Sequence, residues 1–225
     1  MRAADSARVV HLCACSQARI VAHKWPTHAL RLTQALCLKR GIKLSELLKV
    51  LKQENDIGKV IQSHIHIENE LHEFIAQRAA DEASVKALQL DYIGSSHLAI
   101  VLGLPKKYLS SLKCIGNLRN KFAHRLDQSL GPGEVNNLYK SLHSEEKEEI
   151  NSVLKEYFNE KDKKFIPFSQ LPINEQYTVL VIVLRASVHI ACMTVIHNAK
   201  LQELQSIKGQ QYEKLEAFRK AEEKT

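Results

Sequence analysis

Apolar residues recur at spacings of three and four over most of the chain after residue 44. This spacing matches the period of a helix that buries one face. The clearest stretch predicts a helix from Asn55 to Ala80, in which Asn55 caps the N-terminus and Asp56 adds favourable negative charge. Its apolar stripe contains Ile57, Val60, Ile61, Ile65, Leu71, Phe74 and Ile75. The folded part of the chain is therefore expected to begin close to this long amphipathic helix.

Further helices are predicted by the same periodicity over residues 106–126, 134–143 and 145–158. Residues 88–103 are apolar and leave two alternatives open, a helix that starts near Gly94 or a strand. No partner strand is visible nearby in the sequence. Gly103 is expected to end this segment, because glycine tolerates the left-handed conformation found after helices.

The most apolar part of the chain follows Pro172, where a helix is predicted from Glu175 to about Ile207. Its centre, residues 179–196, approaches the length that spans a membrane, but Arg185 and His189 lie in the middle of it. An arginine exposed to lipid would cost about 2.5–3.5 kcal/mol on insertion scales. The sequence therefore predicts the central core helix of a bundle and no membrane segment.

These elements predict an all-α protein, a single helical bundle with long antiparallel helices. The bundle domain is expected over residues 44–207, and residues 208–225 are expected to form a charged helical tail. Residues 1–43 lack clean periodicity and are expected to be a basic, poorly ordered extension.

The net charge of +7 comes entirely from that extension, which holds eight basic residues and one acidic residue. The other 182 residues hold 24 basic and 24 acidic residues, so the body is neutral. Nucleic acid binding normally needs a basic surface. The charge of residues 44–225 therefore does not support nucleic acid as a partner.

Metal and cofactor sites are not predicted. The five cysteines are scattered and contain no C-x-x-C pair, which is typical of a reducing cytosol rather than of a disulfide framework. His64 and Glu68 are four residues apart, but no H-E-x-x-H motif completes a metal site, so we interpret them as a polar pair. We expect a cytoplasmic protein that uses neither a metal nor a cofactor.

The sharpest candidate chemistry lies in the segment LRNKFAH, where Arg119 and Asn120 precede His124. Arg119 falls within the apolar stripe of the predicted helix over 106–126. One interpretation is structural: Arg119 is held inside the bundle by an anionic neighbour such as Glu68, and His124 caps the helix. The other is catalytic: the arginine steadies a phosphate and the histidine transfers a proton.

Geometry limits the catalytic interpretation. On a regular helix Arg119 and His124 are separated by about 140° and ~7.5 Å along the axis. A compact site then requires the helix to end near His124, or a second subunit to complete the site. Geometry alone leaves both alternatives open.

A second polar pair, Arg185 and His189, lies four residues apart on the predicted central helix. Burying an unpaired charge is costly, so we expect these side chains to form a network with Glu68 or Glu70. The alternative is a pocket for a partner or ligand. Glu68, Arg119, Arg185 and His189 are therefore the candidate binding residues.

The segment from about Glu54 to Asp127 resembles the mannitol operon repressor family, within the HEPN-like group (higher eukaryotes and prokaryotes nucleotide-binding) of all-helical proteins. The resemblance rests on ENELHEFI, on the turn from Ala99 to Gly103, and on LRNKFAH. It implies a regulator of transcription that acts through protein partners or an effector, without a standard DNA-reading helix. The R-x4-6-H motif of HEPN proteins implies the alternative, a metal-independent endoribonuclease that uses Arg119, Asn120 and His124 across a dimer cleft.

Overall fold

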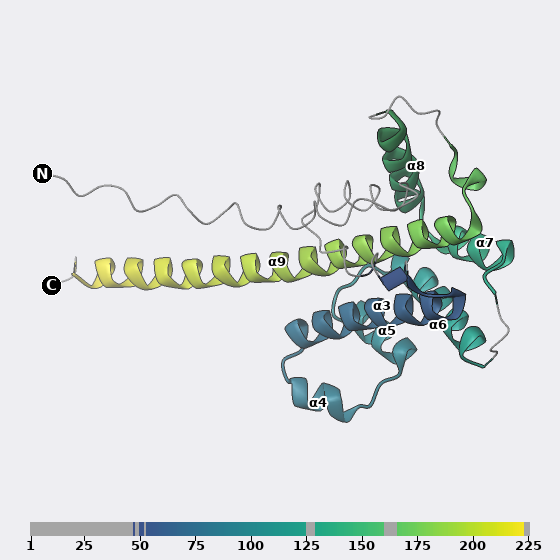
Figure 1. Ribbon diagram of the computed structural model, residues 1–225. Helices are drawn as coiled ribbons and strands as arrows, with labels where there is room; N and C mark the ends of the chain where they lie inside the picture. The colour runs from purple at the N-terminus through teal and green to yellow at the C-terminus, as the bar shows by residue number, and fades with distance from the viewer. Residues whose placement is uncertain (1–46, 48–49, 52, 125–128, 160–165, 223–225) are drawn as a thin grey trace, which may run out of the picture.

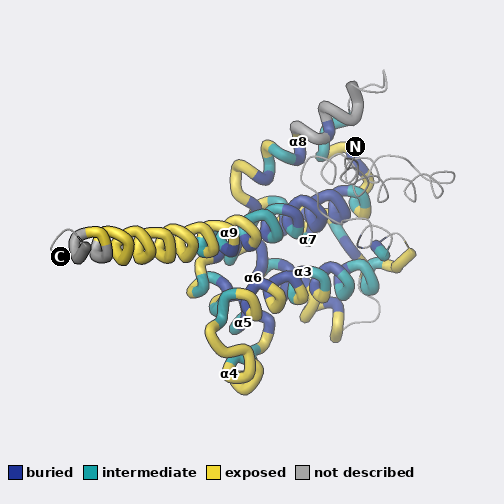
Figure 2. Tube along the Cα trace, turned by 90° about the vertical axis from the view of Figure 1, so that its left-hand side faces the viewer, coloured by how far each residue is buried: buried dark blue, intermediate teal, exposed yellow. Residues whose placement is uncertain are grey.

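The structure, a computed structural model, describes residues 47, 50, 51, 53–124, 129–159 and 166–222. Within these ranges the protein consists of helices and contains no strand, which confirms the all-α prediction (Figure 1). The predicted basic extension over residues 1–43 lies outside the described residues. The core sits between helices α3, α6 and α9, where buried residues gather (Figure 2).

Helix α3 (Asp56–Arg78) confirms the long amphipathic helix predicted from Asn55. The Asn55 side chain accepts a hydrogen bond from the Gly58 backbone N–H at 2.8 Å, as a helix cap does. The buried face differs from the predicted stripe, because the Ile65 side chain is 40% exposed, whereas Ile67, which the predicted stripe omitted, is fully buried. Ile57 and Ile61 are half-buried. The remaining buried face packs against α5, α6 and α9.

Helix α5 (Tyr92–Val101) decides the alternative that the sequence left open for residues 88–103 in favour of a helix. Its cap is Asp91, whose carboxylate accepts a hydrogen bond from the Gly94 N–H at 2.7 Å. Gly103 follows the helix with a φ of +115°, a conformation that other residues rarely adopt. A short helix that the sequence did not predict, α4 (Glu82–Ala87), precedes α5 and has no buried residue.

The middle of the chain forms three helices close to the predicted ranges. They are α6 (Leu109–Ala123), preceded by a 3-10 turn η2 (Lys106–Tyr108), then α7 (Pro132–Ser141) and α8 (Ser144–Asn159). Helix α7 begins two residues earlier than expected, because Pro132 occupies its first position, where a proline loses no hydrogen bond. A second turn, η3 (Phe168–Gln170), leads into the last helix.

Helix α9 (Ile173–Glu222) is 50 residues long and continues past the predicted end near Ile207 without a break. By length and apolar composition one of its segments could cross a membrane, and 56% of that segment is buried in the structure. The first half of α9 lies in the core, whereas the second half projects beyond the bundle as a single helix (Figures 1 and 2).

The relative directions of the three central helices are given by one contact and by Figure 1. The Asp56 carboxylate at the start of α3 accepts a hydrogen bond from the Leu130 N–H, beyond the end of α6, so α3 and α6 are antiparallel. Glu70, further along α3, contacts Arg185 and His189 of α9. Helices α3 and α9 run in the same direction (Figure 1).

Candidate functional site

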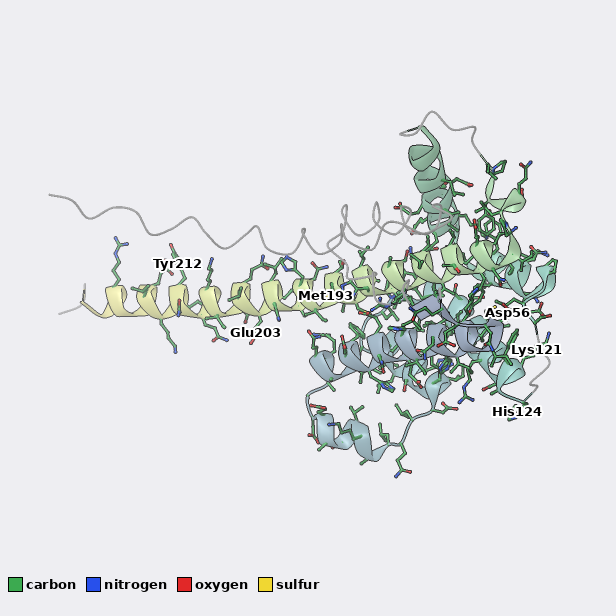
Figure 3. The ribbon with its side chains drawn as sticks, in the orientation of Figure 1. Asp56, Lys121, His124, Met193, Glu203 and Tyr212 are labelled. Atoms are coloured by element: carbon green, nitrogen blue, oxygen red, sulfur yellow. The ribbon has the colours of Figure 1, made fainter. Side chains whose placement is uncertain are left out.

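The predicted motif residues lie together at the C-terminal end of α6. Arg119 and Asn120 are in the last turn, and His124 is the residue that ends the helix. All three are exposed, and His124 lies at the side of the bundle that faces away from the projecting half of α9 (Figure 3). The helix thus ends at His124, which is compatible with both interpretations of the motif.

The prediction that the Arg119 guanidinium is buried is wrong. The side chain is exposed, and its Nη1 donates a hydrogen bond to Oδ1 of the neighbouring Asn120 at 3.2 Å. The reason lies in α5, which packs against α6 at Gly116, where an added Cβ would lie 2.9 Å from a ring carbon of Tyr92. Because Tyr92 is the first residue of α5, the last turn of α6 extends past the helix that would cover it.

A polar group lies next to Arg119 at the junction of α3, α5 and α6. The rings of His64 and Tyr92 are 4.2 Å apart, and Nδ1 of His64 lies 3.6 Å from a Glu68 carboxylate oxygen. Burial lowers the pKa of His64 from 6.5, the Glu68 charge opposes this shift, and the Arg119 charge adds to it. Glu68 therefore pairs with His64, as the sequence analysis interpreted, and the charge of Arg119 reaches this histidine.

Tyr92 is a residue that sequence reasoning missed. Its hydroxyl is buried and has no hydrogen-bond partner among the described residues. Burial raises the pKa of Tyr92, so the phenol is neutral at any physiological pH. The periodicity of residues 88–103 indicated an apolar segment and gave no signal that a buried phenol would face His64.

The second predicted pair forms the network that we expected, with Glu70 rather than Glu68. Nδ1 of His189 donates to a Glu70 carboxylate oxygen at 2.5 Å, and Nη2 of Arg185 lies 3.8 Å from the other oxygen. The hydrogen bond to Glu70 raises the pKa of His189, against a smaller opposing effect of burial. One carboxylate thus joins α3 to two cations of α9, which is a structural role.

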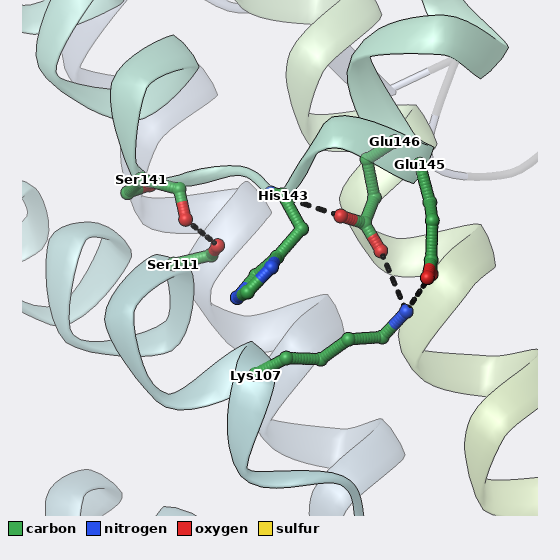
Figure 4. A network of polar contacts seen from close by, with 6 residues as sticks. All are labelled: Lys107, Ser111, Ser141, His143, Glu145 and Glu146. Atoms are coloured by element: carbon green, nitrogen blue, oxygen red, sulfur yellow. Dashed lines mark hydrogen bonds and ion pairs between the residues drawn. The ribbon is translucent and has the colours of Figure 1, made fainter.

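The polar contacts of η2 form a third group (Figure 4). The Lys107 ammonium contacts the Glu145 carboxylate and lies 3.6 Å from Glu146, which in turn accepts the His143 N–H at 2.9 Å. The contact with Glu145 raises the pKa of Lys107 and lowers that of Glu145. Beside this group is an open hollow of about 410 Å³, lined by Tyr108, Glu145, Glu146, Glu148, Glu149, Ser187 and Ile190.

Five of the nine large apolar side chains that are exposed among the described residues lie on the projecting half of α9. We call these five side chains the tail face: Leu201 (42%), Leu204 (55%), Ile207 (45%), Tyr212 (69%) and Leu215 (69%). At 100° per residue they lie within an arc of about 140°. The opposite side carries polar residues such as Gln202, Glu213 and Glu216. This segment was expected to be polar, and its stripe was not predicted, although the spacing of three to five residues between its apolar residues was the available signal.

Comparisons with protein families, with curated proteins and with solved structures found no match for this chain. Among the described residues, no group of three or more histidine, cysteine, aspartate or glutamate side chains could hold a metal ion.

Proposed function

We propose that this protein is a cytoplasmic regulator of transcription that acts through a protein partner or effector, as the resemblance to the mannitol operon repressor family implies. The observation that carries the proposal is the tail face. Helix α9 places five large apolar side chains in water along one side of a projecting helix. Large apolar side chains gathered on one exposed face of a protein mark a site of interaction.

Charge supports the same function over direct reading of DNA. Residues 44–225 hold equal numbers of basic and acidic residues, so the body lacks the excess positive charge that attracts phosphates. An amphipathic helix that presents an apolar face is instead a common means of protein recognition. The regulator would thus bind a protein rather than a promoter.

The experiment compares transcripts in the source cell with the gene deleted and with the gene restored as wild type or as Leu204→Glu. We expect deletion to change a defined set of transcripts and the wild type to restore them. Leu204→Glu should fail to restore them, whereas Gln210→Glu, which adds the same charge on the polar side of the helix, should succeed. Unchanged transcripts after deletion would refute a regulatory role.

A second candidate function is the HEPN-type endoribonuclease. The observation that favours it is the exposure of Arg119, Asn120 and His124 at one end of α6. The test incubates the protein with structured RNA in EDTA. Cleavage that disappears in both Arg119→Ala and His124→Ala would support the enzyme, and no cleavage by the wild type would exclude this activity under those conditions.

A further inference from the structure

Residues 200–216 of α9 are exposed, so no described residue supplies the packing that normally stabilises a helix. From His197 to Glu222 the projecting half of α9 extends about 39 Å at 1.5 Å per residue. Most of the stability of a helix in a protein comes from burying its apolar face, and isolated helices are marginal in water. A partner surface of similar length that covers the tail face would therefore stabilise this half of the helix.

Three of the five residues of the tail face fall at core positions of a heptad repeat, the pattern of two helices that wind around each other, and Ile207 and Tyr212 fall at the positions that flank the core. Leu201, Lys208 and Leu215 fall at one core position of the heptad, and Leu204 and Gln211 fall at the other. The core positions of the repeat are therefore apolar near both ends and polar in the middle, at Lys208 and Gln211. Such a step commonly fixes the register of a coiled coil.

We propose that the tail face binds the tail face of a second copy of this chain, as an antiparallel two-helix coiled coil. The inference rests on the proposed function, because it names the occupant of the same face. In this arrangement Leu204 packs against the partner's Leu215. Lys208 meets the partner's Gln211, whose amide oxygen accepts a hydrogen bond from the ammonium group.

Charge selects the antiparallel orientation over the parallel one. A parallel pair would place each Lys208 beside the partner's Lys208 and each Lys214 beside the partner's Arg219. Like charges at these positions are destabilising. In the antiparallel pair Lys214 instead flanks the partner's Ile207, and no two like charges face each other at the core and flanking positions. The surface is thus complementary to itself, as a two-fold symmetric interface requires.

The shape of the molecule accommodates this pairing. Tyr212 and Glu203 lie on the projecting half of α9, well separated from the rest of the bundle (Figure 3). Two antiparallel tails would therefore hold the two bundles at opposite ends of a rod. His124 lies on the far side of each bundle, so this dimer keeps the two LRNKFAH motifs apart. The proposed dimer consequently favours the regulator over a nuclease site that spans a dimer cleft.

The first experiment measures the mass of the full chain by sedimentation equilibrium. At roughly 50 μM, far above a Kd of about 1 μM, we expect a dimer. Leu204→Glu should raise the dimer Kd by roughly a hundredfold, because two buried leucines are lost per dimer. Gln210→Glu, with the same added charge on the polar side, should leave the Kd unchanged. A monomeric wild type, or a dimer indifferent to Leu204→Glu, would overturn the proposal.

The second experiment tests the orientation with a matched pair of variants at one position. Gln211→Glu places a carboxylate opposite the partner's Lys208 twice per dimer and should lower the Kd by about fivefold. Gln211→Lys places two ammonium groups together and should raise the Kd by a similar factor. If Gln211→Glu instead weakens the dimer, the helices are parallel and the antiparallel pairing is wrong.

These results are separable from the fate of the proposed function. A monomeric protein whose Leu204→Glu variant still fails to restore transcripts would overturn the dimer and leave the regulator standing, with a different protein on the tail face. A dimer that depends on Leu204 while deletion of the gene changes no transcripts would confirm the pairing and refute the regulatory role.

Discussion

The two halves of α9 carry similar apolar side chains in opposite environments. Leu180, Leu184 and Val188 in the first half are fully buried, whereas Leu204 and Leu215 in the second half are more than half exposed. The neighbouring helix explains the difference. Helix α3 runs beside α9 and contacts it at Arg185 and His189 through Glu70, but it ends only eight residues later, at Arg78. Helix α9 therefore extends beyond the bundle from about residue 197 onward.

This comparison shows that burial in a helical protein depends on the length of the neighbours as well as on the pattern of a helix. The first half owes its stability to contacts within one chain. The second half has an amphipathic pattern of its own but no described helix beside it. Substitutions in the two halves should therefore affect different properties, namely folding in the first half and association in the second.

The largest contrast is expected between two leucine truncations on the same helix. Leu184→Ala should lower the free energy of unfolding by about 2–5 kcal/mol, because it leaves a cavity in the core. Leu204→Ala should change it by less than about 0.5 kcal/mol at a concentration where the protein is monomeric. Chemical denaturation of both variants measures the difference. Equal losses would mean that the tail is part of the same cooperative core.

The polar contact between α3 and the buried half of α9 should give the next largest effect. Glu70→Gln keeps the size of the side chain but removes the charge that pairs with Arg185 and His189. We expect a loss of about 1–3 kcal/mol in the free energy of unfolding, since both cations lose their carboxylate. A change near zero would show that this network does not hold the two helices together.

The same network should make stability depend on pH. The pKa of His189 is raised in the folded protein, so its contribution is fully present below pH 6.5 and is lost as the pH rises through that raised value. His64 acts in the opposite sense, because burial lowers its pKa and stability falls as the pH drops below 6.5. Denaturation between pH 5 and 9 should show the high-pH loss in the wild type. His189→Gln should abolish that loss and retain the low-pH one.

The smallest expected effect concerns the helical content of the projecting half. Gly209 lies in the helix with no atom of another residue near its missing side chain. Gly209→Ala should therefore stabilise the tail by about 0.5–1 kcal/mol without a steric cost. Amide hydrogen exchange should slow in the tail and remain unchanged in the core half of α9. Slower exchange throughout the protein would indicate that tail and core unfold together.

Much of the fold could be predicted from the sequence, because most helices have a periodic apolar stripe and a recognisable capping residue. Asn55 marks the start of α3, and the stripe that follows it predicts the buried face. Helix α4 was missed because it buries nothing, so it has no stripe, and it depends on the carboxylate of Asp81, which accepts hydrogen bonds from the Ala83 and Ser84 backbone N–H groups. The pattern of a single helix could not predict where a neighbouring helix ends.

The candidate sites depended on the same information, namely where the neighbouring helices begin and end. The network of Arg185 and His189 could be predicted, because an unpaired buried charge is costly. Its partner could not be chosen between Glu68 and Glu70 from the sequence, because that choice depends on how α3 and α9 are aligned along their axes. Arg119 was expected inside the bundle from its angle on α6, yet α5 begins level with Gly116 and leaves the last turn uncovered. The tail face was overlooked because its apolar residues alternate with many charged ones.

The most direct test of the account is the distance between two labels on paired tails. Spin labels attached through a genetically encoded amino acid at Gln202 or at Gln210 would leave the native cysteines unmodified. In the antiparallel pair, the two Gln210 positions differ by only ~1.5 Å along the axis and the two Gln202 positions by ~22 Å. Pulsed electron resonance should therefore give a short distance for Gln210 and a distance longer by more than ~10 Å for Gln202. Equal distances at the two positions, or no dipolar signal at either, would contradict the account.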